Sequence, residues 1–594
     1  PLSGAVTQES GGTFKAKTLL GAVGGELTLD QGVELDQLGT LAVGGSFALT
    51  DGGEAVGPAG LLFVGDVTAS STADITSDSV VDLAEFDLDA TGNAVTINAV
   101  GIRQTYTADG SGTSNSAIAA STATLDAGAG DLLLGSASND FTGAVTPIGT
   151  GNFAVVRDAD GLATVSLEGN IGDTTNLTLI SGGALDLFSE TISLSTGSID
   201  LRSLGGNLST PGLLGTTTGD VNLYASGTLS LANSIVSATS GNISVDGGTI
   251  SSTGGSEFKL ETAGAGDIKV TARTGNFTQA SDFAYSTVDG DITLSATAGT
   301  AALASLSSTN GNLFVNAGGN ITQQTGSQIN VSVIDAKATN DGSITLNSET
   351  GDVRNNDVDV LRLRSRNAAD DAAGSGSLTY YDADGFAVRE LQTASTGDIT
   401  LLAGGAITTE SNPPDNGVSD ETFDRPTGPD EKAVVLTNDQ PVDVEISFTV
   451  DTASDAIILN PILDEAYTVG VAKTFVIPAY TSATALVTAP TGDETPDFTF
   501  SFTETDISTA ALGQISADAL SVAIQADADH NITLDNANND VASLDLQSRN
   551  AADSANQAGN LTFVDVDGFD LTDAQTTGNA LLTAGDAVTQ TNPI

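Results

Sequence analysis

A turn of glycine followed by aspartate or asparagine recurs through the middle of this chain at nearly constant spacing. The turns are Gly219-Asp220, Gly241-Asn242, Gly266-Asp267, Gly290-Asp291 and Gly311-Asn312, with steps of 22, 25, 24 and 21 residues. Each turn leads into a short alternating segment such as VNLYA, IKVTA or ITLSA. Glycine tolerates positive φ and an Asx side chain caps its own turn, so the pair suits a corner between strands. A period in the low twenties is typical of one coil of a β-solenoid, whose successive coils pair in parallel about 4.8 Å apart.

A longer unit of the chain occurs twice. Residues 355–413 open with NNDVDVLRLRSRNAAD and continue through YYDADGFAV, and the stretch from Asn538 opens with NNDVASLDLQSRNAAD and continues through FVDVDGFDL. Arg366 and Arg549 lie 183 residues apart, as do Asp384 and Asp567. Two long copies in near-constant register indicate a repeat architecture. We therefore expect an all-β parallel β-helix with Val, Ile and Leu stacked inside and Thr, Ser, Asn and Asp facing water.

Changes in rhythm divide the chain into four parts. Residues 1–137 give short alternating runs and form the first part of the solenoid, and residues 138–410 form its regular part. Residues 411–510 begin with a Pro-rich acidic linker and continue with longer, Phe-rich strands that suit a small antiparallel β-sandwich inserted into the rod. Residues 511–594 return to the solenoid and hold the second copy. At about 22 residues per coil, the solenoid parts predict about 22 coils and a rod on the order of 100 Å long.

The charge balance limits the classes of partner. The chain has 18 Lys and Arg against 76 Asp and Glu, a formal net charge of −58. Such a surface repels nucleic acid and anionic membranes, and it favours divalent cations or high ionic strength. No apolar run approaches the roughly 18 residues that span a bilayer, so we expect no membrane insertion. The absence of Cys excludes disulfides and thiolate sites. Because the chain starts with Pro and has no Met, we expect it to be a segment of a longer protein.

Two families are similar to parts of the chain. The segments SASNDFTGAV, GDITLLAGGAITT and GNITQQTG resemble the haemagglutinin-like β-helix repeats of very large secreted bacterial surface proteins and adhesins. That resemblance implies a right-handed β-helix, export to the bacterial cell surface or beyond, elongated rods, and roles in adhesion or matrix building. The segment KTFVIPAYTSATALVTAPTGDETPDFTFSFT resembles the Calx-beta type of immunoglobulin-like domain. The paired calcium-binding aspartates of that family are only partly matched here, by Asp493 and Glu494.

Three Asp-x-Asp-Gly motifs are the strongest candidates for chemistry. They place pairs of carboxylates two residues apart ahead of a glycine: Asp158 and Asp160, Asp382 and Asp384, Asp565 and Asp567. Calcium loops begin in this way, and Ca²⁺ takes six to eight oxygen ligands. The distal bidentate Glu of such loops is absent, so the alternative is a solenoid corner in which Asp caps the turn and Gly supplies positive φ. Calcium is the one cofactor that the sequence indicates, at these pairs and at Asp493 and Glu494.

The tripeptide Ser-Arg-Asn is repeated in a chain with few basic residues. Arg366 is followed by Asp370, and Arg549 by Asp553. Each arginine either binds an acidic glycan or pairs with the nearby aspartate and fixes the turn, and the sequence favours the pairing.

These patterns favour a structural protein over an enzyme. We expect a subunit or segment of an extracellular bacterial fibre or surface layer, which self-associates into filaments or sheets through solenoid stacking and lateral contacts. One alternative is an adhesin segment that binds surface glycans or partner cells. A second is a polysaccharide-active β-helix enzyme, which requires a groove with clustered Arg, Lys or aromatic residues; the small number of basic residues and the absence of Trp disfavour it. Whether the Tyr and Arg residues gather on one face separates these hypotheses.

Overall fold

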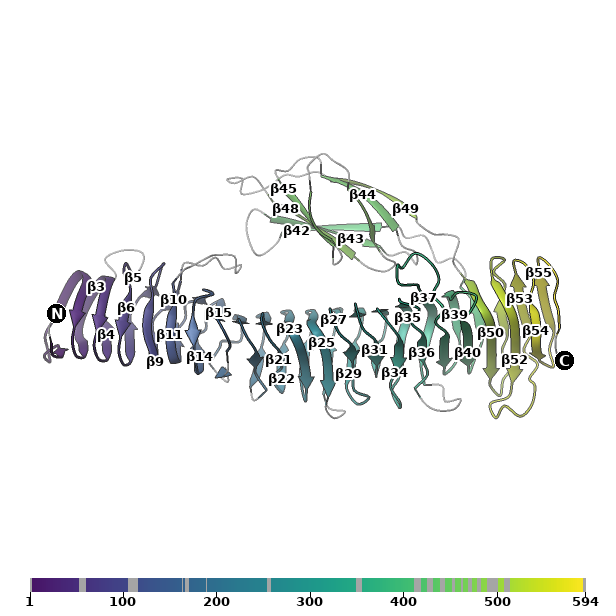
Figure 1. The fold of residues 1–594 in the computed structure, drawn as a ribbon, viewed down its shortest axis with the longest axis horizontal. Coiled ribbons are helices and arrows are strands. Elements are labelled where there is room, and N and C mark those ends of the chain that lie inside the picture. Colours follow the sequence, from purple (N-terminus) through teal and green to yellow (C-terminus); the bar gives the residue numbers. More distant parts are fainter. Residues whose placement is uncertain are drawn as a thin grey trace.

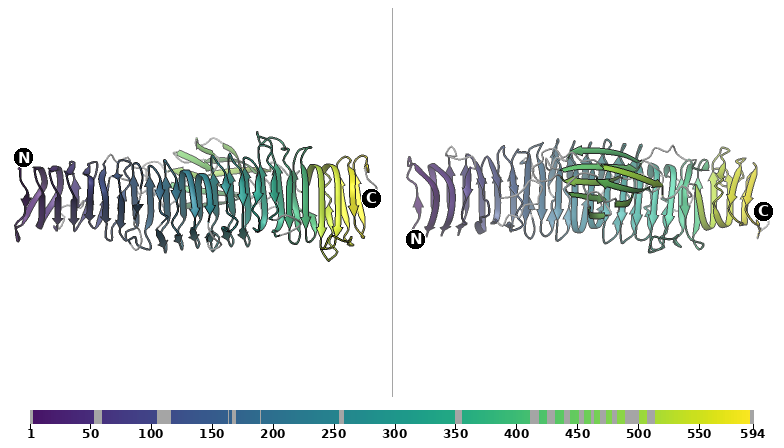
Figure 2. Two further views of the ribbon diagram at one scale, coloured as in Figure 1. Left: turned by 60° about the horizontal axis from the view of Figure 1, so that its bottom comes forward. Right: turned by 90° about the horizontal axis from the view of Figure 1, so that it is seen from above.

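The computed structural model describes residues 3–52, 60–104, 116–162, 170–188, 190–253, 258–348, 355–410 and 513–590, and the backbone of strands β16 (Thr164–Val165) and β42–β49 between them. The described chain is all-β, without a helix. Forty-seven strands form one parallel sheet that winds into a rod of about 19 turns (Figures 1 and 2). At about 4.8 Å per coil, the rod is on the order of 90 Å long. It has fewer coils than the predicted 22 because some coils carry long turns: Ile344 pairs with Leu378, 34 residues later.

The middle of the rod shows the coil most clearly, because one strand of each coil stacks on the same strand of the next. We call this stack of eleven strands the long sheet. It consists of β15 (Phe153–Asp158), β17 (Asn176–Ser181), β20 (Ile199–Ser203), β23 (Val221–Ala232), β25 (Ile243–Thr253), β27 (Ile268–Ala272), β30 (Ile292–Ala296), β33 (Asn312–Ala317), β35 (Ile329–Ala338), β37 (Asp357–Ser365) and β39 (Phe386–Gln392).

The residues that follow the Gly-Asx turns pair directly with one another in this sheet. Val221 pairs with Ile243, Ile243 with Ile268, Ile268 with Ile292, and Ile292 with Leu313. All five side chains point inward and are fully buried in one continuous apolar core. The spacing of the turns is therefore the length of the coil, and the predicted repeat β-solenoid is confirmed.

The glycines of these turns are needed for a different reason from the one expected. None of the five has a positive φ. A Cβ on Gly266 would instead lie 2.0 Å from the carbonyl oxygen of Gly241, and a Cβ on Gly290 would lie 2.1 Å from that of Gly266. Glycine is required at this corner because consecutive coils approach too closely for any side chain.

The Asx side chains of the same turns form a ladder along the rod. Each Oδ1 accepts the backbone N–H of the Asx one coil later: Asp220 from Asn242 (2.8 Å), Asn242 from Asp267 (2.9 Å), Asp267 from Asp291 (2.8 Å) and Asp291 from Asn312 (2.8 Å). Each side chain thus caps the next coil, not its own turn as predicted. Burial raises the pKa of Asp291 to about 6, and the neighbouring Asp267 adds to the effect.

Strands β42–β49 lie in the sequence between β41 (Ile407–Thr409) and β50 (Gln514–Gln525) and are not part of the sheet of the rod. These strands are antiparallel and form a five-stranded and a three-stranded sheet, and Figure 1 shows them beside the rod. They are β42 (Val418–Asp424), β43 (Glu431–Asn438), β44 (Val444–Val450), β45 (Asp455–Asn460), β46 (Leu463–Tyr467), β47 (Lys473–Ile477), β48 (Ser482–Thr488) and β49 (Phe500–Asp506).

The rod continues across this insertion without a change of register. Ile399 of β40 (Asp398–Ala403) pairs with Leu520, and Ile407 pairs with Ile532. The last coils contain β51 (Ile532–Leu534), β52 (Asp540–Arg549), β53 (Leu561–Asp565), β54 (Asp570–Gln575) and β55 (Ala580–Ala584). The coils before the long sheet run from β1 (Val6–Thr7) to β14 (Ala144–Ile148).

Candidate functional site

Three corners of the rod are built on the same two buried polar residues, an asparagine and, one coil later, an aspartate. The asparagines are Asn139, Asn356 and Asn539, and the aspartates Asp158, Asp382 and Asp565 begin the three Asp-x-Asp-Gly motifs; all six are 0–3% exposed. The residue after each aspartate donates its backbone N–H to the backbone carbonyl oxygen of the asparagine, with N···O distances of 2.7, 2.7 and 2.8 Å in chain order. We call this arrangement the corner module.

Asn356 shows how the asparagine of a corner module is satisfied. Its Oδ1 accepts from the amide of Gln323 (2.8 Å) and from the backbone N–H of Ile329 (3.0 Å). Its Nδ2 donates to the carbonyl oxygens of Leu346 (3.2 Å) and Tyr381 (3.1 Å). A buried position with donors on one side and acceptors on the other requires an amide, because a carboxylate cannot donate and an apolar side chain leaves every partner unpaired.

The first aspartate of each motif accepts hydrogen bonds in the rod interior. The Asp382 carboxylate accepts from the Tyr380 hydroxyl (2.6 Å) and from the N–H groups of Val358 (3.3 Å) and Asp384 (3.2 Å). Burial raises the pKa of Asp382 to about 8 and that of Asp565 to about 6. This is the geometry of the solenoid corner, although the expected positive φ is absent at the glycines, Gly385 included.

The second aspartate of each motif is nearer the surface. Asp384 and Asp567 are exposed, and each accepts the N–H of its own following glycine at 2.7 Å. Their carboxylates help to raise the pKa of Asp382 and Asp565 respectively, so each motif does bring two carboxylates together. Within the described ranges, no three His, Cys, Asp or Glu residues are placed to hold a metal ion. Asp493 and Glu494 lie outside the described residues, and calcium binding stays a prediction.

The two Ser-Arg-Asn turns are fixed by their own aspartates. Nε of Arg366 lies 3.3 Å from Oδ1 of Asp370, and Nε of Arg549 lies 2.8 Å from Oδ1 of Asp553. Both aspartates have positive φ, 57° and 50°. The ion pair with the arginine holds each aspartate in this left-handed backbone conformation. The predicted pairing of arginine and aspartate is confirmed.

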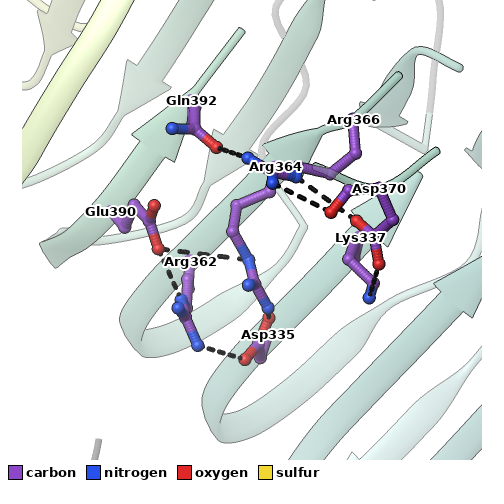
Figure 3. A network of polar contacts seen from close by, with 8 residues as sticks. All are labelled: Asp335, Lys337, Arg362, Arg364, Arg366, Asp370, Glu390 and Gln392. Carbon is purple, nitrogen blue, oxygen red and sulfur yellow. Dashed lines mark hydrogen bonds and ion pairs between the residues drawn. The ribbon is translucent and has the colours of Figure 1, made fainter. Parts of the chain in front are cut away.

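A buried ion network lies on the outer side of β35, β37 and β39 (Figure 3). Oδ2 of Asp335 lies 3.0 Å from Nη1 of Arg362, and Oδ1 of Asp335 lies 2.9 Å from Nη2 of Arg364. Nε of Arg362 lies 2.7 Å from Oε2 of Glu390. These side chains are only 10–16% exposed. Burial alone would raise the pKa of Asp335, but the two guanidinium groups lower it to about 2.

A further ion pair lies at the base of the insertion. Arg389 is the extra residue of a β-bulge in β39, because Leu361 pairs with Val388 while Arg362 pairs with Glu390. Its guanidinium makes two bonds of 2.7 Å to Glu410, the last described residue before the insertion. The N–H of Gly513, the first described residue of the returning rod, donates to the Arg389 carbonyl (2.5 Å). One residue thus ties both ends of the insertion to the coil.

The outer side of the long sheet, which we call the long face, carries two columns of side chains in register. One column is Val155, Thr178, Asp200, Asn222, Ser244, Lys269, Thr293, Phe314, Asp335, Arg362 and Glu390; the other is Arg157, Ile180, Arg202, Tyr224, Asp246, Thr271, Ser295, Asn316, Lys337, Arg364 and Gln392. Six of these residues are basic and four are acidic, in a chain of net charge −58. Four arginines, Arg157, Arg202, Arg362 and Arg364, therefore lie on one face together with Tyr224, while Tyr285 and Tyr380 are buried in the core.

A hollow of about 300 Å³ opens on the long face over β20, β23 and β25. Its lining includes Asp200, Arg202, Asn222, Tyr224, Ser244 and Asp246. Nε of Arg202 donates to Asp200 (2.8 Å). The guanidinium carbon of Arg273 lies 4.5 Å from the centre of the Tyr224 ring, and the same group is bonded to Asp246.

Sequence reasoning missed the buried asparagines, the ion network and the hollow. The asparagines carried a signal, because an Asn-Asp pair precedes every Asp-x-Asp-Gly motif, at residues 139, 356 and 539. The network and the hollow depend on which residues become neighbours across coils of unequal length.

Comparison with known proteins gives one match. Residues 84–147 match the model of a family described as repeats of unknown function (DUF5649). No curated protein and no solved structure matches the chain. Nothing in the described part of the chain is a helix with the length and hydrophobicity of a membrane span. The match covers β9 (Leu88–Asn98) to β14 and agrees with a repeat protein built as a β-solenoid.

Proposed function

We propose that the chain is a structural segment of an extracellular bacterial fibre or surface layer. The observation that carries this proposal is the unbroken register of the rod across residues 411–512, where Ile399 stacks on Leu520 and Ile407 on Ile532. A chain that holds its coils in register on both sides of a large insertion has the architecture of a stalk that displays a lateral module. The Arg389–Glu410 pair supports this by closing the coil at the base of the module.

In this proposal the rods associate through their coils and the insertion makes lateral contacts. A solenoid is stabilised by contacts between neighbouring coils, so coils of separate molecules can stack by the same contacts as coils of one chain. The β-helix is right-handed, as in the haemagglutinin-like repeats, and the insertion is an immunoglobulin-like sandwich of the Calx-beta type. Calcium bridges the exposed second carboxylates of the corners, Asp160, Asp384 and Asp567, between rods and offsets the mutual repulsion of the rods.

Electron microscopy of the purified chain, first with calcium and then with a chelator, tests the proposal. We expect periodic filaments or sheets built of rods with side projections. Filaments that fray on chelation support the calcium bridges, whereas filaments that ignore the chelator keep the structural role and remove the metal. Rods that stay separate at every concentration and calcium level contradict self-association. Doubling the salt concentration controls for simple charge screening.

A segment of an adhesin is the second candidate function. The observation that favours it is the hollow on the long face, which Arg202 and Tyr224 line and where Arg273 stacks over the Tyr224 ring. A fibre component and an adhesin are compatible, because a rod displays a binding face along its whole length.

A further inference from the structure

The hollow on the long face differs in charge from the rest of this acidic protein. Two carboxylates, Asp200 and Asp246, are paired with two guanidinium groups, Arg202 and Arg273, and Lys269 also lies near Asp246, so the site carries no excess of negative charge. Each arginine is already paired with one of the carboxylates. An anionic ligand would therefore have to compete with these two carboxylates for either guanidinium group, and a cation would have to compete with the guanidinium groups for either carboxylate.

The polar groups of the hollow are arranged in a row across three coils. Asp200, Asn222 and Ser244 are direct neighbours in one column, so their side chains are spaced at about 4.8 Å. The row offers a carboxylate, an amide and a hydroxyl, which together both donate and accept hydrogen bonds. This spacing is close to the distance between equatorial hydroxyl groups on alternate carbons of a pyranose ring.

The hollow also has an apolar wall. Tyr224 is half-buried in the second column, and Arg273 holds its ring by a cation–π contact at 4.5 Å. Leu204, which also lines the hollow, is 41% exposed. A fixed aromatic ring beside an exposed leucine supplies the surface on which the C–H face of a sugar packs.

We propose that this hollow binds a neutral glycan, one pyranose unit of which packs against Tyr224 and Leu204 while its hydroxyl groups bond to the row of Asp200, Asn222 and Ser244. The volume of about 300 Å³ lies at the lower end of the range for small-ligand sites, which fits one or two sugar rings. The inference is independent of the proposed structural role, since a separate rod and an assembled fibre carry the same hollow.

The test is a screen of the full chain against arrayed neutral and acidic glycans, followed by calorimetry with the best neutral oligosaccharide. We expect neutral glycans to bind and Tyr224→Ala and Asn222→Ala each to weaken binding at least tenfold. Thr293→Ala, in the same column as Asn222 but outside the hollow, is the matched control and should leave the affinity unchanged. Circular dichroism and electron microscopy of each variant confirm that the rod is intact.

Three results would overturn the assignment. One is a screen in which no neutral glycan binds. Another is a preference for acidic glycans, which would mean that the arginines leave their carboxylates to bind an anion. The third is equal affinity of the wild type and the two hollow variants, which would place the binding elsewhere. Because binding is measured on single rods, a failure to form filaments would not affect the outcome.

Discussion

The two copies of the duplicated unit share their turns and differ in the charges on their outer strands. Arg366 in the first copy and Arg549 in the second make the same contacts: each pairs with the aspartate four residues later, and each donates to a glutamine at 2.6 Å, Gln392 or Gln575. Two and four residues earlier, the first copy has Arg364 and Arg362 where the second has Gln547 and Asp545.

This substitution changes the column that stacks across the coils. In the first copy Arg362 lies between Asp335 and Glu390, whereas in the second Asp545 pairs with Ser521 and Asp573. The pKa of Asp545 is raised by burial and further by the charge of Asp573. The turns depend on backbone geometry and tolerate little change, but an outer column needs only to match its two neighbours. The copies therefore keep one function, coil closure, and are free to differ in the surface they present.

Exchanging the central residue of the two columns has the largest expected effect. Arg362→Asp removes the cation between Asp335 and Glu390 and adds a third carboxylate, and we expect it to lower the local unfolding free energy by about 3–5 kcal/mol. Asp545→Arg places a cation next to Asp573 and should stabilise the second copy by up to about 1 kcal/mol. Hydrogen–deuterium exchange of β35–β39 and β52–β54 measures both. Equal exchange in Arg362→Asp and the wild type would show that the network adds nothing.

The corner modules of the two copies should differ in strength. Asn356 bonds to Gln323 as well as to backbone groups, whereas Asn539 bonds to the backbone of Ile515, Leu534 and Val564. Leaving several buried groups unpaired predicts a loss of about 3 kcal/mol for Asn356→Leu and about 2 kcal/mol for Asn539→Leu. Urea unfolding followed by circular dichroism and by local exchange gives the two values. A larger loss at residue 539 would contradict the role given to Gln323.

Stability should depend on pH over a wider range in the first copy. The native pKa of about 8 for Asp382 lies above the pKa of the same group in the unfolded chain. Between about pH 4 and pH 8 the native state therefore binds more protons than the unfolded state, and the free energy of unfolding falls as the pH rises. For Asp565, at about 6, the fall ends near pH 6. Asp382→Asn should therefore be most harmful at pH 4 and least at pH 8. Melting temperatures of both Asn variants between pH 4 and 9 check this, and a constant difference from the wild type would refute it.

The shared turn gives the smallest effect. Arg549→Met should cost about 1 kcal/mol, and Arg366→Met about half as much, because Lys337 also holds Asp370 at 2.7 Å in the first copy only. Exchange rates of the amides in residues 367–374 and 550–557 report the loss of each turn. The double variant Lys337→Met, Arg366→Met is the control, and it should match Arg549→Met.

The coil could be predicted from the sequence because its corners repeat. Gly266 and Asp267 recur one period away in both directions, so length and register follow from spacing alone. Their physical roles could not be predicted, because both involve residues of different coils: Gly266 lies close to the Gly241 carbonyl, and the Asp291 N–H donates to the Asp267 side chain. The ion network was less accessible still, because the bulge at Arg389 shifts Glu390 into register with Arg362.

The ladder of Asx side chains has a consequence for how such a chain changes in evolution. In the run from Asp220 to Asn312, the side-chain oxygen of each Asx residue accepts a hydrogen bond from the next coil, and the backbone N–H of the next Asx residue donates it. A gene rearrangement that removes or inserts a whole coil leaves two surfaces that already fit, whereas loss of half a coil leaves none. Rod length can therefore drift in units of one coil among descendants of this gene while the fold is preserved.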